Sequence, residues 1–123
     1  MRFYCTDDTV DLEQYPYHVR DVHISDPFIL ADPKSRCYYT YVQFADIERF
    51  PDVETDKENG VFYVLESKDL IHWSKPQICF RQNNFWADKD YWAPEVHIWK
   101  GRYYLFSSFR ADGHYRKCQC LVS

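Results

Sequence analysis

A short phrase occurs twice in this sequence. Its clearer copy is the apolar run 91–97 around Pro94, which leads through the turn residues Lys100-Gly101 into an aromatic strand. Its looser copy surrounds Pro27, 67 residues earlier, and leads through a Pro-containing turn into the aromatic run 37–41. Alternating residues that are bounded by such turns predict pairs of antiparallel strands. A unit that recurs at this period indicates a stack or ring of similar sheets.

The rest of the chain completes this pattern. Predicted strands cover 24–30, 37–44, 60–67 and 73–80 in a first set, and 92–99, 102–109 and 116–122 in a second. Because Pro27 lacks a backbone donor, its strand should be an edge strand or the innermost strand of a blade. A four-stranded sheet followed by most of another is typical of successive blades in a β-propeller, so the predicted fold class is all-β.

This pattern divides the chain into a lead-in and two sheets. Residues 1–22 are an extended lead-in, 23–80 a first blade and 91–123 an incomplete second blade, within one partial domain over 1–123. The charged segment 45–59 predicts a surface loop. Its acidic residues favour a solvated rim over a cation site.

The composition of the chain argues against some classes of binding partner and favours others. A formal charge of -4 argues against a nucleic-acid partner, which would require a basic patch. The 20% aromatic content favours strands. Tyr and Trp also suit sugar rings, because they combine an apolar face with a polar edge. No apolar run is long enough to span a membrane, and the absence of a signal-peptide pattern favours the cytoplasm.

Three motifs carry a resemblance to a known family. They are 20–30, ending Ser-Asp-Pro-Phe-Ile-Leu, then 66–73 (Glu-Ser-Lys-Asp-Leu-Ile-His-Trp), then 91–97 (Tyr-Trp-Ala-Pro-Glu-Val-His). In this order they resemble the opening of a family 43 glycoside hydrolase. The resemblance implies a five-bladed β-propeller that cleaves α-L-arabinofuranosides or β-D-xylosides in plant polysaccharides with inversion of configuration. This chain would hold its first blade and most of its second.

Asp26 is the candidate catalytic residue. Inverting glycosidases require one carboxylate that activates water and a carboxylic acid that protonates the leaving group. By resemblance, Asp26 matches the general base, and an aspartate fixed by Pro27 on an innermost strand would sit at a partly dry central site. The alternative is a structural turn residue, since Asp-Pro often starts turns. The family's acid and pKa-tuning carboxylates lie in later blades, beyond Ser123, so we expect the isolated chain to be inactive.

Two residues of the second motif are candidate substrate-binding groups. Trp92 is either a platform for a sugar ring or a residue that packs between blades. Glu95 follows in an apolar run, and we expect it to be buried and satisfied by hydrogen bonds near the site. No His, Cys or Asp cluster has metal-ligand spacing, so we expect neither a metal nor a cofactor.

A second hypothesis assigns no catalysis. The chain length and the aromatic content also fit a carbohydrate-binding or structural module that copies of the chain complete by assembling into a ring. Under either hypothesis the unpaired blade faces are apolar and should drive self-association, which gel filtration would detect.

Overall fold

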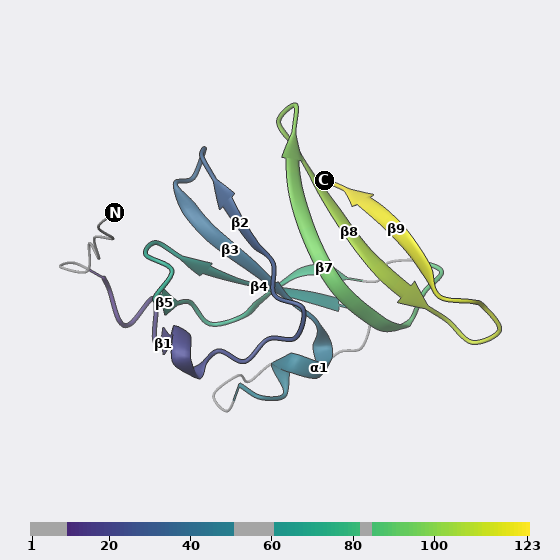
Figure 1. Cartoon of the computed structure of the whole chain (residues 1–123), viewed down its shortest axis with the longest axis horizontal. Helices are drawn as coiled ribbons and strands as arrows, with labels where there is room; N and C mark the ends of the chain where they lie inside the picture. The colour runs from purple at the N-terminus through teal and green to yellow at the C-terminus, as the bar shows by residue number, and fades with distance from the viewer. Residues whose placement is uncertain (1–9, 51–60, 82–84) are drawn as a thin grey trace.

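Two antiparallel sheets stand next to each other in the computed structural model, which describes residues 10–50, 61–81 and 85–123 (Figure 1). Sheet A consists of β1 (Tyr17–His18), β2 (Ile29–Asp32), β3 (Cys37–Val42), β4 (Val61–Ser67), β5 (His72–Trp73) and β6 (Gln77–Arg81), and sheet B of β7 (Lys89–Trp99), β8 (Arg102–Arg110) and β9 (Lys117–Val122). The strand order is β1-β5-β4-β3-β2 in sheet A, where β6 also pairs with β4, and β7-β8-β9 in sheet B. The predicted all-β class is therefore confirmed.

Helical structure is confined to two short segments of the described chain, η1 (Val19–Asp21) and α1 (Phe44–Ile47). Figure 1 shows α1 at the lower edge of sheet A. Neither segment is long and apolar enough to cross a membrane.

Both predicted hairpins are present. Strand β2 pairs with β3 in antiparallel register, with Leu30 opposite Tyr39. Strands β7 and β8 are joined at Lys100 and Gly101, whose φ angles are 47° and 74°. Two consecutive residues with positive φ form the type of turn that matches the twist of a hairpin, and glycine adopts this conformation without steric cost.

Two boundaries differ from the prediction. The first strand begins at Ile29 rather than at residue 24, so Pro27 precedes the edge strand instead of lying in it. Part of the lead-in belongs to the fold, because β1 pairs with β5 and the side chains of Tyr15 and Tyr17 are buried. Residues 1–9 lie outside the described part of the chain.

Aromatic packing joins the two sheets. The ring centroid of Phe62 in sheet A lies 5.3 Å from that of Tyr91 and 6.0 Å from that of Phe109, both in sheet B. These rings bury large apolar areas, and Phe62 and Phe109 meet edge to face. A hydrogen bond of 2.7 Å from the Tyr103 hydroxyl to Asp32 Oδ2 also crosses between the sheets and lowers the pKa of Asp32. Much of the high aromatic content therefore serves this contact.

The face of sheet B that points away from sheet A is open and carries exposed apolar side chains. Trp99, Phe106 and Val122 lie on it with 59%, 43% and 51% of their surface exposed. Side chains alternate between the faces of a strand, so the same strands send Val96 and Phe109 towards sheet A. Self-association through the open face stays a prediction.

The turn at 67–73 is organised by one carboxylate. Asp69 accepts hydrogen bonds from the backbone N–H groups of Ile71 and His72 at 2.9 and 2.8 Å, and His72 Nδ1 lies 2.7 Å from Asp69 Oδ2. Burial opposes the charged form, but the hydrogen bonds from His72 and the neighbouring backbone outweigh it and lower the pKa of Asp69 from 3.8 to about 2. The turn directs Trp73 into the core, where it is 3% exposed.

Asp69→Asn should destabilise the chain in a pH-dependent way. The folded pKa of Asp69 lies below its unfolded value, so the carboxylate stabilises the fold above about pH 4 and this contribution is lost as the pH falls towards 2. A pKa change of this size corresponds to about 2 kcal/mol. Urea unfolding should show the variant less stable by about that amount at pH 7, with the difference shrinking in acid.

Asp21→Asn is the matched control, because that carboxylate is 65% exposed. It should change the free energy of unfolding by well under 1 kcal/mol at any pH, as surface substitutions usually do. A deficit of Asp69→Asn that stays constant from pH 7 to pH 3 would contradict this account of the turn.

Candidate active site

Asp26 lies in the loop that leads into β2. Its φ angle is 50°, and the side chain is exposed rather than in the partly dry environment that the sequence predicted. A residue before proline normally adopts an extended backbone, and a non-glycine residue with positive φ is uncommon. Within the described residues, none forms a hydrogen bond or an ion pair with the Asp26 carboxylate. Because β2 begins at Ile29, three residues after Asp26, the expectation that Asp26 lies on a strand is wrong.

A buried carboxylate anchors the residue before it. Asp46, in the first turn of α1, is 1% exposed and accepts hydrogen bonds from the backbone N–H of Ser25 at 2.9 Å and from its hydroxyl at 3.0 Å. The guanidinium of Arg49 lies 3.9 Å from the same carboxylate. The backbone N–H of Ser25 is thus bonded to a side chain and is not available for a strand ladder. This explains why the strand starts late.

The same short helix also contacts the second motif. Gln43 is the N-cap residue of α1, is 8% exposed, and accepts a hydrogen bond of 3.2 Å from the backbone N–H of Ala93. The φ angle of Ala93 is 52°, so the residue before Pro94 repeats the positive φ of Asp26. The two phrases that resemble each other in sequence therefore share a backbone conformation, and α1 holds both.

Trp92 and Glu95 flank this second segment on β7. Two irregularities in the register between β7 and β8 lie around them, between Lys89 and Trp92 and between Trp92 and Glu95. Such bulges re-aim side chains and often occur next to active sites. Trp92 is 46% exposed, and its carbonyl accepts a 2.6 Å hydrogen bond from the Ser107 hydroxyl.

Glu95 is more open than the sequence predicted. Its side chain is 50% exposed, and Oε2 lies 3.5 Å from Nε2 of His97. The expectation of a buried carboxylate is wrong because residues 95 and 97 alternate with the buried Val96 and point to the open face of sheet B. A half-exposed carboxylate can accept hydrogen bonds from a bound molecule.

The two segments meet through aromatic contact. The ring centroid of Phe28, two residues after Asp26, lies 5.2 Å from that of His97. The carbonyl of Phe28 is itself fixed by a 3.1 Å hydrogen bond from the Thr40 hydroxyl. The structure therefore brings the Asp26 loop against the strand that carries Glu95. An open carboxylate on one segment and a carboxylate with an exposed indole on the other can bind a polyhydroxylated molecule and activate a water.

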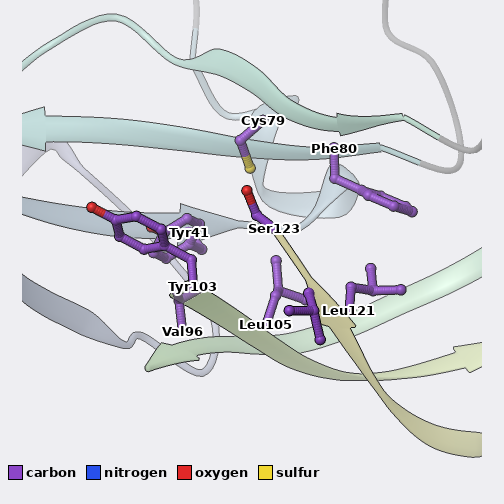
Figure 2. A pocket seen from close by; sticks show the side chains of 9 residues that line it. Tyr41, Cys79, Phe80, Val96, Tyr103, Leu105, Leu121 and Ser123 are labelled. Atoms are coloured by element: carbon purple, nitrogen blue, oxygen red, sulfur yellow. The ribbon is translucent and has the colours of Figure 1, made fainter. Parts of the chain in front are cut away.

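The pocket between the sheets is a different feature. It has a volume of about 360 Å³ and is lined mainly by apolar side chains from both sheets, among them Tyr41, Val96 and Leu105. Figure 2 shows Tyr103, Leu105 and Leu121 of sheet B facing Tyr41 and Cys79 of sheet A. It contains no carboxylate side chain and none of the predicted site residues, so its chemistry does not suit hydrolysis.

Sequence reasoning missed the residues that position the site. The structure shows Asp46 buried, whereas the charged run 45–59 predicted a solvated loop. The spacing of Ile47 and Phe50, both buried, is the helical signal that could have indicated an inward-facing turn. Residues 51–59 of the predicted loop lie outside the described part of the chain.

Metal binding has no visible basis in the described residues. Among them, no three His, Cys, Asp or Glu side chains are grouped so that they could hold a metal ion.

Comparisons with known proteins identify relatives. Residues 18–122 match the sequence model of glycosyl hydrolases family 43. Among solved structures, the endo-arabinase from Bacteroides thetaiotaomicron VPI-5482 is 34% identical, with a TM-score of 0.71 over 89% of this chain. A thermostable family-43 glycoside hydrolase is 27% identical, with a TM-score of 0.59 over 81% of the chain. A GH43 endo-arabinanase from Bacillus licheniformis, 21% identical over 84% of the chain, has a TM-score of 0.54 and shows likeness of fold alone.

The chain spans about a third of the length of these structures, namely 34%, 28% and 33% of the three chains. None of the curated proteins matches the sequence significantly.

Asp46→Asn should destabilise the fold. The backbone N–H and the hydroxyl of Ser25 donate to different oxygens of Asp46, and asparagine replaces one of these oxygens with an NH₂ donor and removes the charge that strengthens both bonds. Hydrogen bonds to a charged group contribute about 1.5–3 kcal/mol, and we expect a loss of about 2 kcal/mol in the free energy of urea unfolding. Glu48→Gln, at the exposed end of the same helix, is the control and should have little effect. Equal effects of the two substitutions would contradict the anchoring role of Asp46.

Proposed function

The chain belongs to family 43 of the glycosyl hydrolases, and from this premise we propose that it forms part of the active site of an enzyme that hydrolyses arabinofuranosides in plant polysaccharides with inversion of configuration. The observation that carries the proposal is the position of Asp26, an open carboxylate held beside the segment that contains Trp92 and Glu95. The runner-up, a non-catalytic carbohydrate-binding module, would use the same aromatic surface.

The proposed parent fold is a five-bladed β-propeller. Most of sheet A would be the first blade, predicted over 23–80, and sheet B would be most of the second, predicted over 91–123. In this arrangement β2 and β7 are the innermost strands, since they lie at one edge of each sheet and contact each other. The site would then lie where the innermost strands converge on the propeller axis.

Asp26 is the proposed general base. An inverting enzyme places its base so that a water molecule fits between the carboxylate and the anomeric carbon. The exposed carboxylate of Asp26 has free oxygens among the described residues, and the anchored Ser25 restricts its backbone. The general acid and the carboxylate that tunes its pKa would come from later blades. The described chain alone should therefore bind substrate weakly and not hydrolyse it.

Trp92 and Glu95 are the proposed substrate-binding residues. The exposed indole offers an apolar face on which a sugar ring can stack. The carboxylate of Glu95, next to His97, would accept hydrogen bonds from sugar hydroxyls. Neither residue needs to transfer a proton in this role.

Arabinose-containing polymers are the proposed substrates ahead of β-D-xylosides. The supporting observation is that the structure with 34% identity to this chain is described as an endo-arabinase. The structure with 27% identity is described only as a family-43 glycoside hydrolase.

Asp26→Asn should abolish hydrolysis by the complete enzyme that contains this chain, while sugar binding persists. The amide keeps the size of the carboxylate but cannot take a proton from water. A positioned general base contributes about 10²–10⁴-fold, and we expect kcat to fall by at least the upper figure. The assay uses nitrophenyl arabinofuranoside and nitrophenyl xyloside, and added azide should partly restore turnover of the preferred one by replacing the attacking water.

Asp112→Asn is the control for this experiment, because that carboxylate is 92% exposed in the loop after β8. It should leave kcat unchanged. If Asp26→Asn retains most of its activity, Asp26 is not the base. If the unsubstituted complete protein binds arabino-oligosaccharides but hydrolyses neither glycoside nor arabinan, the non-catalytic function replaces the proposed one.

A further inference from the structure

One face of the Trp92 indole is already occupied. The guanidinium carbon of Arg116 lies 3.8 Å from the centroid of the Trp92 ring, well within the range of a cation–π contact. Trp92 nevertheless keeps 46% of its surface exposed. Since the guanidinium covers one face, the accessible surface belongs to the opposite face and the ring edges.

The guanidinium is itself held in place. Arg116 Nη1 donates hydrogen bonds to the backbone carbonyl of Asp90 at 2.9 Å and to the Ser108 hydroxyl at 3.0 Å. Arg116 Nη2 lies 3.4 Å from the Asp90 carboxylate, which also pairs with Arg110 at 2.7 Å. These partners come from β7 and β8, the strands on either side of the irregular register at Trp92. The position of Arg116 is therefore fixed by the same bulged segment that carries the indole.

Two other cations lie over Trp rings in the described chain, and they provide a contrast. Lys117 lies 5.2 Å from the centroid of Trp86, and Lys100 lies 4.5 Å from that of Trp99. Each is a flexible ammonium group, whereas the guanidinium of Arg116 is planar and forms a fork of hydrogen bonds. Neither of these rings lies in the repeated motif.

We propose that Arg116 is a positioning residue for substrate: it blocks one face of Trp92 and holds the ring so that an arabinose unit stacks on the other. This inference rests on the proposed function. It adds the residue that determines which face of the Trp92 indole binds the sugar. A ring that is held before the ligand arrives loses less conformational entropy on binding, so its affinity is higher. The donors of Arg116 that point to Asp90 and Ser108 are already used, which favours this indirect role over direct binding of sugar hydroxyls.

The test is an NMR titration of the complete protein that contains this chain, ¹⁵N-labelled, with linear arabinotriose, followed at the tryptophan indole N–H signals. Arg116→Ala should raise the Kd about 3–10-fold, because the released indole must then be immobilised when the sugar binds. Arg116→Lys keeps the charge but not the planar fork, and it should fail to restore the affinity. Lys117→Ala removes the cation from Trp86 and is the matched control, with an unchanged Kd.

A second readout tests whether Arg116 holds the ring before the ligand binds. In the unliganded protein, the NMR signals of the Arg116 side-chain protons should be shifted by the ring current of Trp92, and this shift should disappear in Trp92→Leu. Retention of the wild-type Kd by Arg116→Ala would overturn the role of Arg116 and leave the proposed function intact. Absence of any arabinotriose binding by the unsubstituted complete protein would instead overturn the proposed function, and the positioning role with it.

Discussion

The candidate site depends on the hydrogen bonds that α1 (Phe44–Ile47) makes with two distant segments. Asp46 binds the backbone and hydroxyl of Ser25, and Gln43 binds the backbone N–H of Ala93. Both contacts come from side chains that are nearly fully buried. A buried carboxylate is unfavourable unless it is hydrogen-bonded. The helix, the loop that contains Ser25 and the bulged part of β7 that contains Ala93 therefore stabilise one another.

Backbone strain explains why such anchoring is needed. Asp26 and Ala93 both have φ near 50° and both precede a proline. A left-handed conformation costs roughly 1–2 kcal/mol for a residue with a side chain, somewhat less for aspartate. Strain of this kind persists only where the surrounding structure compensates for it, and it is frequent at active sites. Around Trp92, the ion pair between Asp90 and Arg116 likewise stabilises the irregular backbone of β7.

The sequence predicted the sheets better than the site. Strict alternation and the Lys100-Gly101 turn identify β7 and β8, because their pattern is local. The start of β2 was placed too early, since the hydrogen bond that withdraws Ser25 from the ladder comes from Asp46, 21 residues away. The sequence alone does not distinguish a charged residue that is buried, such as Asp46, from one on the surface. Likewise, nothing in the linear sequence places Arg116 against Trp92, because register shifts bring them together.

Hydrogen exchange of two backbone amides tests the central claim most directly. Ser25 and Ala93 lie in irregular segments, where amides normally exchange quickly, yet the structure bonds both to buried side chains. The account predicts that both amides are protected to a similar degree as those of β3. It also predicts that Gln43→Ala selectively releases Ala93, with Ser25 remaining slow. Exchange of both amides at the rate of an unstructured peptide in the unsubstituted chain would contradict the claim that α1 holds the two segments together.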